Sequence, residues 1–254
     1  MIDKNLVKIN FSRWARFYDQ YAFIQSFCAE KMIEQLKDDS FDSIIDIGCG
    51  TGIYTLMLKQ LFPESALTAI DISPAMIFEA KKKMPAGVRF SAVDSEVFKP
   101  QEKYDLITSN VSLQWIQNLR IFFKKYKKHL NPQGTFFVSM FGPGTFYELQ
   151  ETFENFFKEE ITITSNEFAG KGYLESVMDE VFKESIVEQS YYSQKFSSLK
   201  ELLKSIKYTG ARGFGLNNRI TLTEKRLLAL EEVYRQEFKD IVATYQVFFC
   251  RGVL

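Results

Sequence analysis

The feature that most constrains this chain is an apolar segment that runs directly into a glycine-rich turn. Residues 43–47 read Ser-Ile-Ile-Asp-Ile, and Gly48, Gly50 and Gly52 follow at alternate positions. A helix-period segment comes next, so the pattern predicts a buried parallel strand, a tight turn and a helix packed back on the strand. Glycine lets the backbone pass close to a ligand, and free N–H groups at a helix start can contact it. The turn therefore predicts a ligand site, although packing alone can also require glycine.

Two acidic residues near this turn indicate the chemistry of the ligand. Asp46 stands two residues before Gly48, where it could reach an ammonium group, and Asp71 ends a second apolar strand at 66–71. An acid at the C-terminal end of that strand suits the two hydroxyls of a ribose. The G-x-G-x-G spacing is tighter than the G-x-G-x-x-G of dinucleotide sites. An ammonium and a ribose without a pyrophosphate describe S-adenosylmethionine (SAM) better than NAD.

Strands and helices alternate regularly through the middle of the chain. We expect strands at 43–47, 66–71, 88–92, 104–109 and 135–140, and helices at about 52–62, 73–83 (with Ser73 as N-cap) and 118–129. This alternation implies an α/β fold with a parallel sheet, whose ligands bind beyond the C-terminal ends of the strands. The glycine turn, Asp71, Asp94, Asn110 and Gly142 all fall at that edge.

Helical patterns flank this core on both sides. Residues 1–40 look helical, with Phe11, Ala15, Tyr18 and Ala22 on one face of a first helix and a second helix at about 24–36. An aromatic helix there could close over a ligand at the glycine turn. We expect further helices at about 145–158, 170–182, 197–207 and 223–238, forming a lid on the ligand edge, with strands at about 185–194 and 243–250. The chain is therefore expected to be one domain, with an N-terminal cap (1–40), a SAM-binding core (41–142), lid helices with a late strand (143–240) and a last strand (241–254).

Composition argues against several classes of protein. The 254 residues carry 32 basic and 32 acidic side chains, which argues against bulk electrostatic binding to nucleic acid. The three isolated cysteines predict reduced thiols in a cytoplasmic protein, with neither a disulfide framework nor a metal site. No apolar run is long enough to span a bilayer, and the N-terminus does not resemble a signal peptide.

The predicted cofactor-binding residues gather at the strand ends. Asp94 and Ser95 could meet the adenine amino group and a ring nitrogen, whereas Met76 could either lie against the adenine or pack in the core. Tyr18 fits the site and plain helix packing equally well. The predicted set is Tyr18, Asp46, Gly48, Cys49, Gly50, Gly52, Asp71, Ile72, Met76, Asp94, Ser95 and Asn110.

No residue is identified as a catalytic base. The single histidine, His129, ends a lysine-rich helix, and neither H-E-x-x-H nor G-x-S-x-G occurs. Methyl transfer from a sulfonium to a carboxylate needs no base, because a carboxylate is already ionised at neutral pH. The acceptor does need a cation to position it. The candidates for the acceptor pocket are Tyr18, Asn110, Gln114, Trp115, Arg13, Arg16 and Arg212, and Trp115 would equally suit a buried core position.

The glycine turn and the strand-end acids resemble the class I SAM-dependent methyltransferases, and four further stretches resemble one family of them. These stretches are Phe11-Ser12-Arg13 with Tyr18-Asp19 and Gln25, then residues 109–115, then 141–149, and finally Thr209-Gly210-Ala211 with 244–247. They are similar to the malonyl-acyl carrier protein O-methyltransferases of biotin synthesis (the BioC family). Residues 109–115 also resemble trans-aconitate methyltransferases. The resemblance implies a Rossmann-like, seven-stranded, mostly parallel sheet with an antiparallel last strand, N-terminal helices and a helical lid insertion.

The resemblance also implies a reaction and a partner. The enzyme would methylate the free carboxylate of a malonyl thioester on acyl carrier protein, converting SAM to S-adenosylhomocysteine without a metal. Because acyl carrier protein is acidic, Lys124, Lys125, Lys127 and Lys128 could dock it, although a solvated face is the simpler interpretation. No nucleic acid or membrane contact is expected. The alternatives are a methyltransferase of a small free carboxylic acid such as trans-aconitate, a SAM-binding module without catalysis, and a NAD-dependent oxidoreductase.

Overall fold

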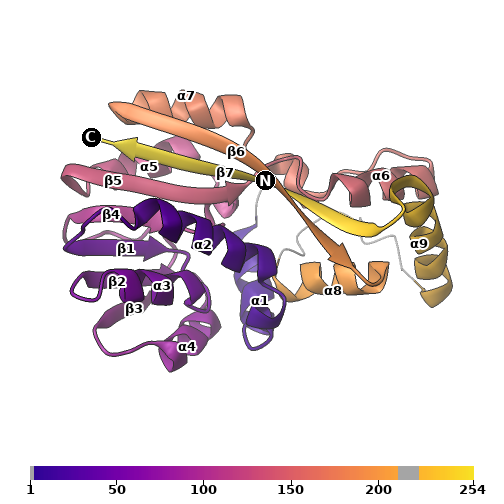
Figure 1. The fold of residues 1–254 in the computed structure, drawn as a ribbon, viewed down its shortest axis with the longest axis horizontal. Coiled ribbons are helices and arrows are strands. Elements are labelled where there is room, and N and C mark those ends of the chain that lie inside the picture. The colour runs from indigo at the N-terminus through magenta and orange to yellow at the C-terminus, as the bar shows by residue number, and fades with distance from the viewer. Residues whose placement is uncertain (1–2, 211–222) are drawn as a thin grey trace.

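A seven-stranded sheet forms the centre of the computed structural model, which describes residues 3–210 and 223–254 (Figure 1). The strands lie in the order β3-β2-β1-β4-β5-β7-β6. Their bounds are β1 Ser43–Ile47, β2 Ala66–Asp71, β3 Val88–Ala92, β4 Tyr104–Ser109, β5 Leu130–Phe141, β6 Glu184–Phe196 and β7 Ile241–Val253. In the described part of the chain, only β7 runs antiparallel to its neighbours. The predicted sheet, mostly parallel with an antiparallel last strand, is confirmed.

Helices cover both faces of the sheet because the side chains of its strands alternate between them. Ile44 and Leu106 belong to the apolar cluster beneath α2 (Phe23–Leu36) and α3 (Ile53–Leu61). Ile45 and Ile107 belong to the opposite cluster, beneath α5 (Leu119–Lys127) and α7 (Lys171–Val181). These strands are apolar on both faces, as expected for buried parallel strands.

Side-chain caps fix where several helices begin. The hydroxyl of Ser73 accepts from the N–H of Met76 at 3.2 Å, with proline at the first position of α4 (Pro74–Lys83). The side chain of Asn118 accepts from the N–H of Ile121 at 3.0 Å and so caps α5. The predicted cap at Ser73 is therefore confirmed.

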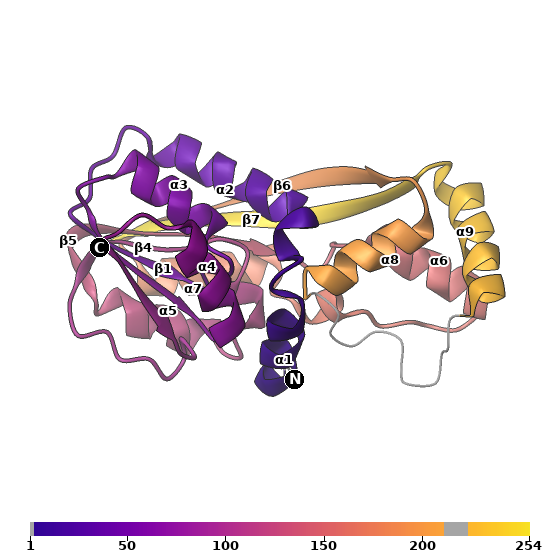
Figure 2. The ribbon, with the colours of Figure 1, turned by 90° about the horizontal axis from the view of Figure 1, so that it is seen from below.

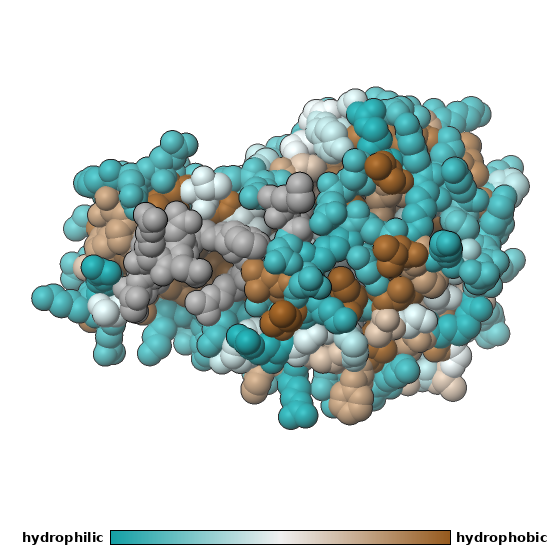
Figure 3. All heavy atoms as spheres, turned by 180° about the vertical axis from the view of Figure 1, so that it is seen from behind, coloured by the Kyte–Doolittle hydropathy of each residue, from teal (hydrophilic) through white to brown (hydrophobic). Residues whose placement is uncertain are grey.

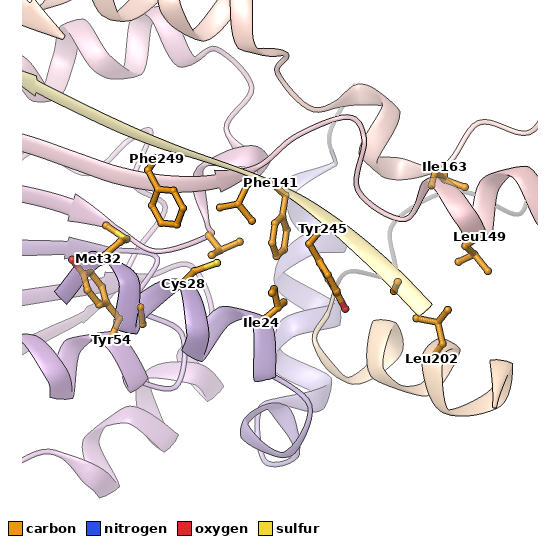
Figure 4. Packing of buried hydrophobic residues seen from close by; sticks show 14 of the residues in the cluster. Ile24, Cys28, Met32, Tyr54, Phe141, Leu149, Ile163, Leu202, Tyr245 and Phe249 are labelled. Atoms are coloured by element: carbon orange, nitrogen blue, oxygen red, sulfur yellow. The ribbon is translucent and has the colours of Figure 1, made fainter. Parts of the chain in front are cut away.

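Strands β6 and β7 extend past the C-terminal ends of the parallel strands and form an arm (Figures 1 and 2). The helices α6 (Tyr147–Phe157), α8 (Leu199–Tyr208) and α9 (Glu224–Phe238) pack on this arm. Leu149, Leu202 and Tyr245 in the arm belong to the same apolar cluster as Cys28 and Phe141 near the sheet (Figure 4). The arm and the sheet therefore share one hydrophobic core.

The structure differs from the sequence-based expectations at three places. The first N-terminal helix is shorter than its periodicity predicts, because α1 (Lys4–Trp14) ends before a 3-10 turn, η1 (Tyr18–Gln20). Strand β5 begins at Leu130, five residues before the predicted start at 135. Its first residues form an irregular stretch, in which Gln133 has a φ of 66°. The helix α7 is not part of the lid, since it packs on α5 and β6 over the sheet.

The outer surface is mostly polar. Figure 3 shows hydrophilic side chains over most of the rear face, with apolar ones gathered near its lower middle. None of the helices in the described ranges is both long and apolar enough to cross a membrane.

Candidate active site

The loop between β1 and α3 is the tight turn that the sequence predicts. Gly48, Gly50 and Gly52 have φ values of 70°, 55° and 84°, a backbone region that favours glycine. A Cβ on Gly48 would lie 1.9 Å from the Oγ of Ser112, so no side chain fits there. The N–H groups of Gly48 and Cys49 donate to the carbonyl of Ile70 at 2.7 and 3.0 Å. The loop is thus held against the end of β2.

Asp46 is a buried carboxylate with one oxygen left without a donor. Its side chain is 1% exposed, and its Oδ2 accepts from the hydroxyl of Thr55 at 2.6 Å. Its Oδ1 has no hydrogen-bond partner among the described residues. Burial raises the pKa of Asp46 to about 7, against the lowering effect of the Thr55 hydrogen bond. A buried acceptor of this kind fits a ligand that brings a donor, and a cationic donor would also favour the ionised carboxylate.

A second unpartnered acceptor lies at the same place. Gln25 of α2 is 9% exposed, and its Oε1 has no donor among the described residues. Its backbone carbonyl accepts from Nδ2 of Asn110 at 2.9 Å. Gln25, Asp46, Asn110 and Tyr18 line a cavity of about 30 Å³ together with the glycine turn. Gln25 is not among the residues predicted from the sequence, and its one signal is its place in the N-terminal segment that resembles the family.

Asp71 ties the glycine turn to the start of α4. Its two oxygens accept from the N–H groups of Gly50 at 3.0 Å and Ser73 at 2.7 Å. Burial raises the pKa of Asp71 to about 6, although both hydrogen bonds lower it. Each oxygen keeps a further lone pair, which a ligand hydroxyl can use. Burial and the nearby Asp71 also raise the pKa of Tyr18, so this phenol stays neutral.

The N-terminal helix α1 lies over the far end of the predicted cofactor site. Lys4 donates to both oxygens of Asp94, at 2.7 and 2.9 Å, and also forms an ion pair with Glu96. The hydroxyls of Ser12 and Ser73 lie 2.8 Å apart and add a second tie. An adenine amino group bound at Asp94 would therefore share this carboxylate with Lys4 or displace it.

The other two residues predicted at the adenine are Ser95 and Met76. The carbonyl of Ser95 accepts from Nζ of Lys125 at 2.8 Å and from the hydroxyl of Tyr126 at 3.0 Å. The N–H of Ser95 is not used in those bonds. Met76 is 1% exposed on α4, packed under the same end of the site. Cys49 is also buried, whereas Ile72 is half-buried.

Of the predicted residues after β4, Asn110 lines the cavity at the glycine turn, whereas Gln114 lines a separate cavity of about 310 Å³ with Leu119 and Tyr173. Oδ1 of Asn110 accepts from the hydroxyl of Ser139 at 2.9 Å. Gln114 is 5% exposed and donates to the carbonyl of Val111 at 2.9 Å, while its Oε1 has no donor among the described residues. Trp115, in the 3-10 turn η2 (Leu113–Trp115), is half-buried. Its ring lies edge-on to Phe11 and Phe168, with centroids 6.1 and 5.5 Å away. Trp115 is therefore part of an aromatic wall and not a fully buried core residue.

The structure does not bring the predicted arginines into this cavity. Arg13 and Arg16 are both exposed and do not line it. Arg212 lies outside the described residues.

The predicted lysine face on α5 is largely engaged inside the molecule. Lys124 pairs with Glu180 at 2.5 Å, Lys125 binds the carbonyl of Ser95, and Lys127 binds the carbonyl of Val181. Because α5 ends just before β5 begins, Lys127 and Lys128 lie at the N-terminal edge of the sheet. That edge is opposite the one that carries the glycine turn.

Comparisons with known proteins agree on the class of protein. A family model described as a methyltransferase domain matches residues 18–167. Malonyl-[acyl-carrier protein] O-methyltransferase 2 of Ilyobacter polytropus is 35% identical over 241 residues, covering 94% of this chain and 92% of the relative. The malonyl-[acyl-carrier protein] O-methyltransferase of Bacillus cytotoxicus is 34% identical over 264 residues, covering 98% and 91%.

Solved structures share the fold at low sequence identity. The YcgJ protein from Bacillus subtilis has a TM-score of 0.58 at 13% identity, covering 89% of this chain and 97% of that one. The N-methyltransferase NodS from Bradyrhizobium japonicum, in complex with S-adenosylhomocysteine, has a TM-score of 0.53 at 14% identity, covering 97% of each chain.

Proposed function

This chain belongs to the malonyl-[acyl-carrier protein] O-methyltransferase family of methyltransferase-domain proteins, and from that premise we propose its reaction. It transfers the methyl group of SAM to the free carboxylate of a malonyl thioester on acyl carrier protein, early in the pimeloyl branch of biotin synthesis. The observation that carries the cofactor part of this proposal is the pair of buried, unpartnered acceptors on Gln25 and Asp46. The acceptor substrate follows from the relatives.

The residues of the cleft fit SAM. Oδ1 of Asp46 and Oε1 of Gln25 would bind the ammonium of its methionine part, which supplies both the missing donors and a positive charge. The carboxylate of Asp71 would hold the ribose hydroxyls, and the bare backbone at Gly48 permits close approach of the ligand. Asp94, Ser95 and Met76 would surround the adenine. Cys49, Gly50, Gly52, Ile72, Tyr18 and Asn110 complete the proposed set.

When bound, SAM supplies a methyl group that its sulfonium makes electrophilic. The protein must then hold the acceptor carboxylate in line with that methyl group, and alignment of this kind is worth about 7–11 kcal/mol of the barrier. Phe11, Trp115 and Phe168 exclude water from one side of the cleft. No general base is required, because the carboxylate is already ionised at neutral pH.

The reaction is tested by mass spectrometry on malonyl-loaded acyl carrier protein incubated with SAM. The proposal predicts a mass increase of one methyl group on the malonyl moiety, with S-adenosylhomocysteine released in equal amount. Free malonate and trans-aconitate serve as competing acceptors in parallel reactions. Faster methylation of a free acid would favour the small-acid alternative, and no methylation of any acceptor would favour a binding module.

A further inference from the structure

The lid helix α8 presents a row of lysines to the surface. Lys200, Lys204 and Lys207 follow one another at i, i+4 and i+7, which places them along one side of the helix. The opposite side carries Leu199 and Leu202, which are fully buried in the core of the arm. Lys200 is exposed, and the side chain of Lys204 keeps 42% of its surface exposed.

Aromatic rings connect this helix to the segment between α1 and α2. The ring of Tyr208, at the end of α8, is stacked on Tyr21 at 4.7 Å and lies 5.5 Å from Phe17. Lys204 lies over the ring of Tyr21 at 5.7 Å, and Lys207 over that of Trp14 at 4.6 Å. The lysine row of α8 therefore continues onto the N-terminal segment.

The N-terminal side of this surface adds more positive charge and exposed apolar area. Arg13 and Arg16 are exposed, and neither forms an ion pair with any other described residue. Phe17 is 44% exposed, and Phe23, two residues after Tyr21, is 60% exposed. Exposed aromatic rings rimmed by cations are typical of a protein–protein interface. The acidic Glu201 lies 3.6 Å from Lys204, and Asp19 is paired with Lys83, so the balance stays positive.

This surface borders the mouth of the cleft. Tyr18, which follows Phe17 in the chain, lines the cavity beside Asp46. Gly210, two residues after Tyr208, lies so close to Phe11 that a Cβ there would be 2.6 Å from its ring. Figure 2 shows α1 and α8 as neighbours beyond the ends of the parallel strands. A partner bound here would hold a tethered group next to the site of methyl transfer.

We infer that the surface formed by Arg13, Arg16, Phe17, Lys200, Lys204 and Lys207, here called the α1–α8 patch, docks acyl carrier protein. The identity of the partner rests on the proposed function. An acidic carrier protein matches the positive charge of the patch, and such complementarity steers encounter and fixes orientation. The lysines of α5 match less well, because Lys125 and Lys127 bind backbone carbonyls of this chain and Lys127 and Lys128 lie at the opposite edge of the sheet.

The test reverses two charges on each surface. In Lys200→Glu/Lys204→Glu we expect KM for malonyl-loaded carrier protein to rise about tenfold or more, with KM for malonyl-pantetheine and the Kd of SAM unchanged. The matched control, Lys124→Glu/Lys128→Glu, should leave all three values near those of the wild type. Added salt should raise the wild-type KM for the carrier substrate more steeply than that of the α8 variant. A rise confined to the α5 variant, or no rise in either, would overturn the inference.

Binding measured without turnover separates the patch from the reaction. Calorimetric titration of holo acyl carrier protein should show weaker binding to the α8 variant than to the wild type and the α5 variant. If the wild type methylates the carrier substrate but both variants bind it normally, the patch is wrong and the function stands. If the wild type binds the carrier protein through the patch but transfers no methyl group, the proposed function fails and the patch stands.

Discussion

Two buried acceptor atoms without a donor determine what the cleft can bind. Asp46 and Gln25 come from β1 and α2, and each leaves one oxygen without a donor beside the glycine turn. Leaving a buried acceptor unsatisfied costs about 1–3 kcal/mol, so two such atoms in one cavity are unusual in a native protein. A cationic ligand group between them offsets both costs.

Asp46→Asn should weaken SAM binding while keeping the shape of the side chain. A hydrogen bond to a charged group contributes about 1.5–3 kcal/mol, so the Kd of SAM should rise roughly ten- to a hundredfold. Isothermal calorimetry measures this directly. Asp179→Asn, an exposed position on α7, is the matched control and should bind SAM normally. Unchanged affinity in Asp46→Asn would place the ammonium elsewhere.

The same residue makes stability depend on pH. The pKa of Asp46 is raised from 3.8 to about 7, so the folded protein holds this proton more tightly than the unfolded chain does. The contribution of this proton to the free energy of unfolding is fully present below about pH 4 and is lost as the pH rises through about 7. The free energy of unfolding should therefore fall across this window in the absence of ligand, and fall less in Asp46→Asn. Urea unfolding at several pH values tests this, and parallel curves for the two proteins would contradict it.

Gly48→Ala should destabilise the fold more than Gly50→Ala. Both positions have positive φ, which costs about 1–2 kcal/mol for alanine. At Gly48 the added Cβ also meets Ser112, whereas nothing lies within 4 Å of a Cβ at Gly50. Denaturant unfolding of the two variants measures the difference. Equal losses would mean that backbone strain alone requires glycine here.

Among the structural elements, α1 is tied to the rest of the chain by polar side-chain contacts. It is held over the cleft through Lys4 on Asp94 and Ser12 on Ser73. The ion pair is partly buried, with side-chain exposures of 19% and 25%, so it is screened less than a surface pair.

Lys4→Met should loosen α1 without unfolding the core. The expected result is faster hydrogen exchange of the α1 amides in ligand-free protein, measured by mass spectrometry. Lys8→Met, an exposed position on the same helix, should leave the exchange rates unchanged. Identical rates in the wild type and Lys4→Met would show that the ion pair does not hold the helix.

Elements whose signals are local could be predicted, and those set by distant contacts could not. The bounds of β1 to β4 match the prediction, and β1, β2 and β4 are short, buried, mostly apolar runs bounded by turn residues. The start of α2 was predicted to within one residue, but the end of α1 at Trp14 was missed, since Phe11, Ala15 and Tyr18 also fit a helical period. The partners of Lys124 and Lys127 come from α7, which no local pattern on α5 reveals.

The residues of the candidate site also differ in whether their signal in the sequence is local. The glycine turn and Asp71 each carry a local signal, which is three spaced glycines in one case and an acid at the end of an apolar strand in the other. Gln25 could not be assigned, because a buried glutamine on an apolar helix has no local signature. Its role depends on Asp46 and Asn110, which lie on other elements.

For the molecule as a whole, the arm and the sheet act as one packed body. Their common core runs from α2 through β5 and β7 to α6 and α8. The cavity at the glycine turn is about 30 Å³, far below the roughly 300 Å³ or more of a typical small-molecule site. This cavity alone is therefore smaller than a whole SAM molecule.

A crystal structure of the protein with S-adenosylhomocysteine would show directly where the cofactor binds. We expect the amino group of the ligand to lie within hydrogen-bonding distance of Oδ1 of Asp46 and Oε1 of Gln25, with its ribose hydroxyls on Asp71. An adenosyl group bound away from Asp71 and Asp94, or an amino group that contacts neither acceptor, would contradict this expectation.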